Sequence, residues 1–205
     1  MNKSEKNKNY FKNRVMKRIV LNFLVIVSIA VSAAFTSCTG KITMKAETDS
    51  VGFLLKGEGN ATVNWGNGKR ETLSIDNDGA RFDHDYSGKS LRTVTITGKN
   101  ITVLECQGNE LVSLNFSKNK TLKELNCNSC RLTSLDVSKN VALIRLYCMN
   151  NNLTGSALDA LFKTLHSNYT AETKMIYITY NPGINDCTMS IAMDKGWMIW
   201  GDRKN

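Results

Sequence analysis

The sequence contains few residues that could carry out catalysis. It has two histidines, His84 and His166, and neither lies beside a nucleophile in a recognisable motif. Glycine-rich phosphate loops, nucleophile elbows and paired catalytic carboxylates are absent. The aspartates of 76–85 lack the spacing and the closing glutamate of a calcium-binding loop, which favours solvated turns over a calcium site. These absences predict a protein that is not an enzyme and that holds no cofactor or metal.

Positive charge is concentrated at the N-terminus. The chain of 205 residues has a net charge of +9, from 27 basic and 18 acidic residues. Residues 1–37 hold seven of the basic and one of the acidic residues, so the remaining 20 and 17 leave a net charge of +3. Nucleic-acid binding requires basic residues clustered on the folded part. The sequence therefore predicts no nucleic-acid partner.

Residues 1–37 have the order of an export signal peptide. A basic stretch ends at Arg18, an apolar run covers 19–35, and small residues precede Cys38. The sequence F-T-S-C at 35–38 resembles a bacterial lipobox, which implies lipidation of Cys38. An ordinary cleaved signal and a retained membrane anchor are the alternatives, and each places the folded part outside the cytoplasm. We therefore expect a lipoprotein of the cell envelope, in the outer membrane where two membranes exist, facing either side.

The next segments predict a polar tether and then a small antiparallel β-module. Residues 38–50 are mostly polar and are expected to be the tether. Residues 51–100 contain short strand-like runs, and Asn67-Gly68 between two of them favours a hairpin turn. The motifs W-G-N-G at 65–68 and H-D-Y at 84–86 resemble those of the PKD-like sandwich family, with Asn67 in place of its aspartate. We expect this module to cap the open end of the segment that follows.

Residues 101–153 repeat one pattern almost three times, with a period of 21 residues. The residues that recur at this interval are Leu104, Leu125 and Leu146, Cys106, Cys127 and Cys148, Leu111, Leu132 and Leu153, and Asn119 and Asn140. Apolar residues alternate with variable ones in each copy, which predicts a short strand with one buried side. Stacked copies make a parallel ladder with a leucine and cysteine core. Asn109 and Asn151 are expected to satisfy backbone groups where each copy turns.

The repeats resemble those of a known family. The runs L-x-x-L-x-C-x-x-N/C-x-L at 101–111, 122–132 and 143–153 are similar to bacterial, internalin-like leucine-rich repeats with a cysteine ladder. The resemblance implies a solenoid over 101–166 and a partner bound on its exposed sheet. The expected fold class is therefore α+β and β-rich, with a small antiparallel β-module, a short leucine-rich-repeat solenoid and a helical C-terminal cap.

Residues 167–205 are expected to complete the ladder and close its far end. Before them, Ser156 and Asp159 form a capping-box-like start to a helix with the apolar stripe Leu158, Leu161, Phe162 and Leu165. Residues 175–181 match the repeat and predict a fourth strand, with the leucine, cysteine and asparagine places taken by Ile176, Ile178 and Asn181. The remainder predicts a short helix and then a strand, over 187–195 and 197–200.

Four cysteines are expected to lie close together, namely Cys106, Cys127, Cys130 and Cys148. Four thiols could hold zinc or an iron–sulfur cluster, and the C-x-x-C at 127–130 could be redox-active. The alternative, which we favour, is that they are small apolar core residues. Neighbouring strands lie about 4.8 Å apart, beyond the Cβ separation of a relaxed disulfide. We predict buried, reduced thiols, with Cys187 packed in the cap.

The outward residues of the ladder are the candidate ligand-binding residues. They are Glu105, Gln107, Glu124, Asn126, Asn128, Arg145, Tyr147, Met149, Tyr177 and Thr179. Tyr147 and Tyr177 are expected to stand side by side, and Glu124 and Arg145 to form an ion pair. Such a surface suits a protein or a sugar, and a merely solvated face is the alternative. We predict recognition of a protein partner, with a glycan-binding lipoprotein using Tyr147 and Tyr177 as the alternative function and an enzyme as the third class.

Overall fold

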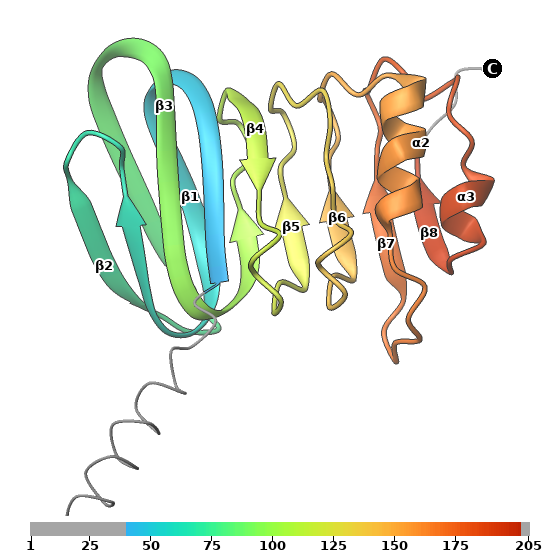
Figure 1. The fold of residues 1–205 in the computed structure, drawn as a ribbon, viewed down its shortest axis with the longest axis horizontal. Helices are drawn as coiled ribbons and strands as arrows, with labels where there is room; N and C mark the ends of the chain where they lie inside the picture. Colours follow the sequence, from blue (N-terminus) through green and yellow to red (C-terminus); the bar gives the residue numbers. More distant parts are fainter. Residues whose placement is uncertain (1–39, 202–205) are drawn as a thin grey trace, which may run out of the picture. The chain divides into compact units, whose positions relative to one another are not determined.

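The computed structural model of the chain describes residues 40–201, which are rich in β-structure and contain few helices (Figure 1). The elements in chain order are β1 (Gly40–Asn64), β2 (Arg70–Ile75), β3 (Ala80–Glu105), β4 (Leu111–Asn115), β5 (Glu124–Asn126), β6 (Arg145–Tyr147), α2 (Gly155–Thr164), β7 (Lys174–Tyr177), α3 (Ser190–Met193) and β8 (Trp197–Trp200). The strands form one mixed sheet of eight. The expected signal peptide over 1–37 and the lipidation residue Cys38 lie outside the described residues.

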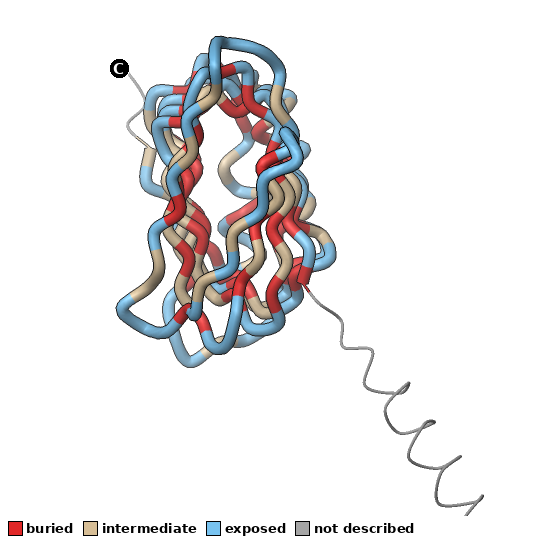
Figure 2. The backbone as a smooth tube through the Cα atoms, turned by 90° about the vertical axis from the view of Figure 1, so that its left-hand side faces the viewer, coloured by how far each residue is buried: buried red, intermediate tan, exposed pale blue. Residues whose placement is uncertain are grey.

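The sheet is folded into two layers because β1 and β3 are long and cross from one layer to the other along their lengths. Met44 of β1 pairs with Val94 of β3, whereas further along β1 Phe53 pairs with Phe82. Register shifts after Thr48 and after Glu58 mark the places where β1 crosses from one layer to the other while it remains paired with β3. Figure 2 shows the result as two walls of backbone with buried residues between them.

Each layer has a definite strand order. The first, which we call the closing layer, consists of segments 70–75, 61–64, 93–98, 40–48 and 111–115, all antiparallel. The second, which we call the ladder layer, consists of segments 80–85, 50–58 and 101–105 followed by β5, β6, β7 and β8. The boundary expected between residues 100 and 101 therefore falls inside β3, which belongs to both layers.

The predicted tether over 38–50 is wrong for residues 40–50, which form the first part of β1. Ile42, Met44 and Ala46 are buried and pair with β3 and β4. The polar residues between them, such as Lys41 and Lys45, face outward and give this segment its polar composition. A strand with one buried side requires only every second residue to be apolar, so the average polarity of the segment was misleading.

The ladder strands are parallel, in the register that the sequence period predicts. Leu104 pairs with Leu125, and Leu125 pairs with Leu146, so residues 21 positions apart are neighbours. Leu146 then pairs with Ile176 of β7, and Ile176 with Ile199 of β8. The four residues from Leu104 to Ile176 are fully buried. This column confirms the predicted hydrophobic stack. It also confirms that residues 175–181 contribute a further strand to the ladder, although the strand covers only Lys174–Tyr177.

Helix α2 begins two residues earlier than predicted, because its N-cap is Thr154 and not Ser156. The Thr154 hydroxyl accepts a hydrogen bond from the backbone N–H of Ala157. Asp159 does not close a capping box, since its carboxylate accepts hydrogen bonds from Thr188 instead. The predicted apolar stripe is buried, namely Leu158, Leu161, Phe162 and Leu165. Over residues 40–201, no helix has the length and apolar content needed to cross a bilayer.

The ladder segments 101–105, β5, β6 and β7 each end in the same left-handed turn. The residue that enters the left-handed region is Gly108, Ser129, Asn150 or Tyr180, with φ between 53° and 76°. The next residue is a buried asparagine in three of the four turns, Asn109, Asn151 and Asn181, and Cys130 in the other. We call this set of four left-handed residues the turn column. The side chains of Asn109 and Asn151 hydrogen-bond backbone groups of neighbouring segments, and that of Asn109 also bonds the backbone of its own turn. This agrees with the role predicted for both residues.

Candidate binding face on the parallel strands

The outward residues of the ladder layer lie in rows across the parallel strands. The first row is Val103, Glu124, Arg145, Met175 and Met198. The second row is Glu105, Asn126, Tyr147, Tyr177 and Trp200. These residues are half-buried or exposed, while the residues between them on each strand are buried or, at Ile199, half-buried. We call the two rows, together with Gln107, Asn128, Met149 and Thr179, the ladder face.

Three aromatic rings are stacked in the second row. The ring centroids of Tyr147 and Tyr177 are 4.6 Å apart with an interplanar angle of 14°. Tyr177 and Trp200 follow at 6.0 Å and 10°. Because strands in a sheet lie about 4.8 Å apart, the ladder itself sets the ring spacing. The predicted pair of tyrosines is therefore confirmed, and it is extended by Trp200, half of whose surface is exposed.

Trp200 was missing from the sequence-based set of candidate residues. The strand over 197–200 was predicted, but it was expected only to close the end of the ladder. Its alternation places Trp197 in the core and Trp200 on the ladder face, with exposed fractions of 2% and 52%. Since Trp200 lies 23 positions after Tyr177, the period of 21 could not have identified it. The alternation within the strand was the signal that could have found it.

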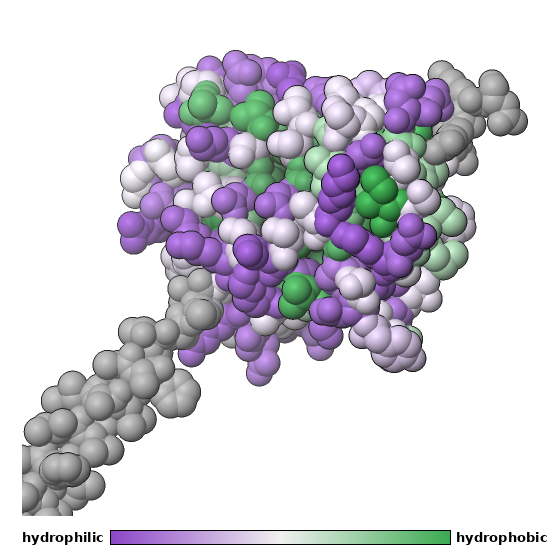
Figure 3. All heavy atoms as spheres, turned by 45° about the vertical axis from the view of Figure 1, so that its right-hand side comes forward, coloured by the Kyte–Doolittle hydropathy of each residue, from purple (hydrophilic) through white to green (hydrophobic). Residues whose placement is uncertain are grey.

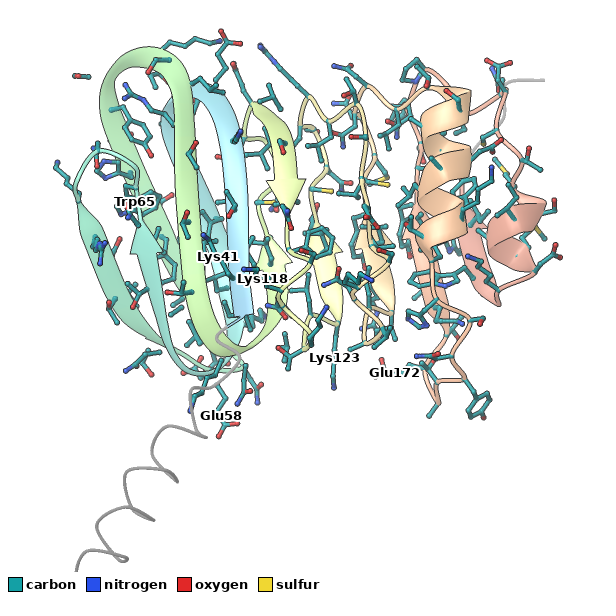
Figure 4. All side chains as sticks on the ribbon, in the orientation of Figure 1. Lys41, Glu58, Trp65, Lys118, Lys123 and Glu172 are labelled. Atoms are coloured by element: carbon teal, nitrogen blue, oxygen red, sulfur yellow. The ribbon has the colours of Figure 1, made fainter. Side chains whose placement is uncertain are left out.

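Arg145 is the centre of a small ion-pair network on the first row. Its guanidinium lies 3.7 Å from the Glu124 carboxylate and 3.0 Å from that of Glu172. The first pair was predicted from the register. Glu172 comes from the loop before β7, at the lower end of the ladder in Figure 4, and no sequence pattern indicated it. The three side chains are partly exposed, so the network contributes about 0–1 kcal/mol per pair to stability and mainly fixes the position of Arg145.

The Tyr147 hydroxyl is held in its neutral form. Burial raises the pKa of Tyr147, and the nearby Glu124 carboxylate and Tyr177 raise it further. The Tyr177 hydroxyl lies 3.6 Å from the sulfur of Met175 in the first row. The aromatic row therefore offers ring edges and hydroxyl groups beside the Arg145 guanidinium.

Two asparagines of the ladder face have a more structural role than expected, namely Asn126 of the second row and Asn128 of the third row. The third row consists of Gln107, Asn128, Met149 and Thr179. The side-chain oxygen of Asn128 accepts a hydrogen bond of 2.7 Å from the backbone N–H of Met149. The side-chain oxygen of Asn126 accepts one of 3.1 Å from the backbone N–H of Asn128. The first bond joins the segments that follow β5 and β6, whereas the second lies within the segment 126–128. The side-chain N–H groups of both residues are left for a ligand.

The four clustered thiols lie inside the ladder. Cys106, Cys127 and Cys148 are fully buried, and Cys130 is 7% exposed. All four are free thiols, and the sulfur atoms of Cys127, Cys130 and Cys148 donate hydrogen bonds to backbone carbonyls. Burial raises the pKa of every one of them, to about 11 for Cys130 and about 12 for Cys148. The predicted burial is confirmed, and Cys187 is buried as well.

The two histidines contact core aromatic residues. His84 stacks on Trp65 at 4.9 Å and 17°, and its Nε2 lies 2.9 Å from the side-chain nitrogen of Asn67. The Tyr86 hydroxyl donates a hydrogen bond of 2.8 Å to the backbone carbonyl of Trp65, so the W-G-N-G and H-D-Y motifs meet in space. His166 contacts the Leu143 carbonyl through Nε2 at 2.7 Å. Across residues 40–201, no group of three or more His, Cys, Asp or Glu residues is arranged to hold a metal ion.

The ladder face is distinct from the other surfaces of the folded part. On the side shown in Figure 3, hydrophobic residues form small patches that hydrophilic side chains surround. Figure 4 places Trp65 among the antiparallel strands, at the left, and Glu172 well to its right, near the lower end of β7. The aromatic row and the Trp65–His84–Tyr86 cluster are therefore separate features.

Comparison with known proteins indicates no function, so a functional proposal for the chain rests on the geometry of the ladder face. No family model, no curated protein and no solved structure matches the chain.

Proposed function

We propose that the chain is an exported, lipid-anchored, non-catalytic binding protein whose ladder face recognises a protein partner. The observation that carries the proposal is the stack of Tyr147, Tyr177 and Trp200 beside Met198 and the ion-paired Arg145. Tyrosine, tryptophan, methionine and arginine are the residues enriched at the centres of protein interfaces. Their concentration on two adjoining rows of the ladder face is the composition expected of such a centre.

The stacked arrangement also lowers the entropic cost of binding. Each ring of the row packs against its neighbour, so its side-chain torsions are restricted before a partner arrives. Ordering a free side chain on binding costs about 0.5–1.5 kcal/mol, and a pre-ordered row avoids much of that cost. The Arg145 side chain is held in the same way by Glu124 and Glu172.

A protein partner fits this row better than the alternative, a glycan. Sugars stack on the open faces of aromatic rings, whereas the facing sides of Tyr147 and Tyr177 cover each other. What the row offers to a ligand is mainly ring edges and hydroxyl groups. Ring edges pack well against side chains of a partner, in the edge-to-face geometry that aromatic pairs prefer.

The proposed fold of the ladder is a leucine-rich-repeat solenoid, with the antiparallel strands as its N-terminal cap. The 21-residue register of Leu104, Leu125 and Leu146 supports this proposal. The repeated asparagine turns and the buried cysteine column support it too. Such solenoids have an open apolar end that must be covered, and the closing layer packs there through β1 and β4.

The proposed anchor is a lipid on Cys38. Only Thr39 separates this residue from β1, so lipidation would hold the folded part close to the bilayer. The proposed location is the cell envelope. Mass spectrometry of the chain purified from envelope fractions tests the anchor, because a diacylglycerol on Cys38 adds a defined mass that the Cys38→Ser variant lacks.

Affinity capture from the cell envelope tests the binding face. The full chain, the row variant Tyr147→Ala/Trp200→Ala and the control variant Val112→Ala/Val141→Ala are each used as bait. The control removes exposed apolar side chains away from the ladder face. We expect a partner that the wild type and the control retain and the row variant loses.

The captured partner is then purified and its affinity for each variant is measured. Truncating an interface hot spot costs at least about 2 kcal/mol, so the row variant should bind at least about tenfold more weakly. Equal binding by the row variant contradicts the proposal. Row-dependent retention of an oligosaccharide in place of a protein supports the glycan alternative.

A further inference from the structure

A hollow lies beside the third row of the ladder face, at the turns that follow β6 and β7. Its volume is about 600 Å³. It is lined by Asn150, Asn151, Asn152, Thr179, Tyr180, Asn181, Pro182, Ile184 and Asn185. None of these residues is charged, although charged residues make up 22% of the chain. The lining is therefore neutral and unusually rich in side-chain amides.

Some of these amides are used by the fold and others are open to a ligand. The side chains of Asn151 and Asn181 are buried and hydrogen-bonded to the backbone of neighbouring strands. Asn152 and Asn185 are exposed, and their side chains make no hydrogen bond to any other residue of the described chain. Each of these two open amides can both donate and accept hydrogen bonds.

Tyr180 is the residue of the hollow that the fold explains least. It belongs to the turn column, with a φ of 61°, and its side chain is 78% exposed. Glycine or asparagine suits this backbone conformation, and Gly108 and Asn150 take the same place in other turns. A bulky aromatic residue is strained there, and so exposed a ring recovers little by packing. Strain of this kind that packing does not offset points to a role for the side chain.

We propose that this hollow is a binding site for a neutral saccharide. A pyranose ring has an apolar C–H face, which would stack on the ring of Tyr180. Its hydroxyl groups both donate and accept hydrogen bonds, which matches the open amides of Asn152 and Asn185. A lining without charge fits a neutral ligand and disfavours phosphorylated or sulfated ones, which bind at arginine and lysine side chains.

The site is independent of the aromatic row of the ladder face. Thr179 is the one lining residue that also belongs to the ladder face, and Tyr147, Tyr177 and Trp200 do not line the hollow. Loss of protein binding at the ladder face should therefore leave saccharide binding unchanged, and the reverse also holds.

Saturation-transfer NMR and calorimetry on the full chain in detergent test the proposal. The probes are neutral oligosaccharides of glucose, mannose and N-acetylglucosamine, together with sulfated forms of each. We expect the wild type to bind at least one neutral probe more tightly than its sulfated form. Binding of no neutral probe, or a preference for the sulfated forms, overturns the proposal.

The decisive variant is Tyr180→Gly. It should lower the affinity for the bound probe at least about tenfold, while the melting temperature stays equal to or above that of the wild type. Ser129→Gly makes the same backbone change in another turn without removing a ring, so it should bind normally. Tyr180→Phe keeps the ring and should retain binding, and Asn152→Ala/Asn185→Ala should weaken it.

The row variant Tyr147→Ala/Trp200→Ala separates this proposal from the protein-binding one, because it should bind the saccharide probe as the wild type does. Unchanged probe affinity in a folded Tyr180→Gly variant overturns the saccharide site, whatever the row variant does.

Discussion

At the scale of single residues, buried asparagines hold the ladder turns in place. The side-chain nitrogen of Asn151 donates to the carbonyls of Cys127 and Cys148, and its oxygen accepts from the backbone N–H of Leu132. One side chain thus joins the backbone of two strands and a loop. These backbone groups are buried and have no access to water, so an apolar side chain at this place would leave them unsatisfied.

Replacing Asn151 should therefore lower stability, because its side chain is buried and hydrogen-bonded to the backbone. A buried polar group left without a partner costs about 1–3 kcal/mol, so we expect Asn151→Ala to lower the free energy of unfolding by about 2–4 kcal/mol. Urea unfolding followed by circular dichroism measures this loss. The neighbouring variant Asn152→Ala is the control, because that side chain is exposed and should change stability by less than about 0.5 kcal/mol. Equal losses for the two variants would show that the hydrogen bonds of Asn151 are unimportant.

The buried thiols predict a decrease in stability at alkaline pH. Burial raises the pKa of Cys148 from its ordinary value of 9.0 to about 12. Above about pH 9 the unfolded chain loses this proton while the folded chain keeps it, so the free energy of unfolding falls as the pH rises toward the folded value. Urea unfolding at about pH 7 and about pH 10 measures the fall. Cys148→Ala should show a smaller fall than the wild type, and an unchanged pH dependence in that variant would contradict this account.

At the scale of elements, the ladder strands are too short to be stable alone. Strands β5 and β6 have three residues each, so their stability depends on side-chain contacts and backbone pairing with neighbouring strands. The buried column of Leu104, Leu125 and Leu146 supplies the apolar contact, and the parallel register fixes which outward residues share a row. The aromatic row of the ladder face is a consequence of that register.

Helix α2 offers a direct test of structure against sequence pattern. The structure makes Thr154 the N-cap, whereas the sequence pattern favoured Ser156. Loss of an N-cap hydroxyl costs about 1 kcal/mol, so Thr154→Ala should lower the free energy of unfolding by about that amount. Ser156→Ala should have a clearly smaller effect. Chemical denaturation of both variants distinguishes the two assignments, and a larger loss for Ser156→Ala would favour the sequence-based one.

At the scale of the whole molecule, the antiparallel strands and the ladder are continuous. The described residues belong to one compact unit, because β1 and β3 each contribute to both layers and β4 returns from the first repeat to pair with β1. A ladder strand and the antiparallel module therefore share a single backbone segment in β3. We expect the two parts to unfold together in one transition.

The first ten residues of β1 test this continuity. Ile42→Ser/Met44→Ser places polar side chains at two fully buried positions of the closing layer and should prevent stable folding. Lys41→Ser/Lys45→Ser changes the exposed side of the same segment and should fold normally. Near-ultraviolet circular dichroism and the cooperativity of unfolding distinguish the two. Normal folding of the Ile42/Met44 variant would restore the interpretation of this segment as a tether.

The sequence predicted those features that repeat at a fixed interval. The column of Leu104, Leu125 and Leu146 and the buried column of Cys106, Cys127 and Cys148 follow from the period of 21 residues. The adjacent Tyr147 and Tyr177, which are 30 positions apart, follow from the match of residues 175–181 to the repeat pattern. Features without a period were missed. Glu172 reaches Arg145 from a loop, and no pattern in the chain relates the two residues. Trp200 lies at an irregular interval after Tyr177, so only the alternation within its own strand indicated that it faces outward.

By itself, the sequence determined which residues are stacked, because a repeated apolar pattern can be buried only by placing its copies side by side. The tertiary structure decided where that stack begins and ends. It turned the segment from Gly40 into a buried strand, divided β3 between two layers and set Trp200 beside Tyr177. These outcomes depend on contacts between segments that share no pattern, and such contacts exist only once the chain has folded.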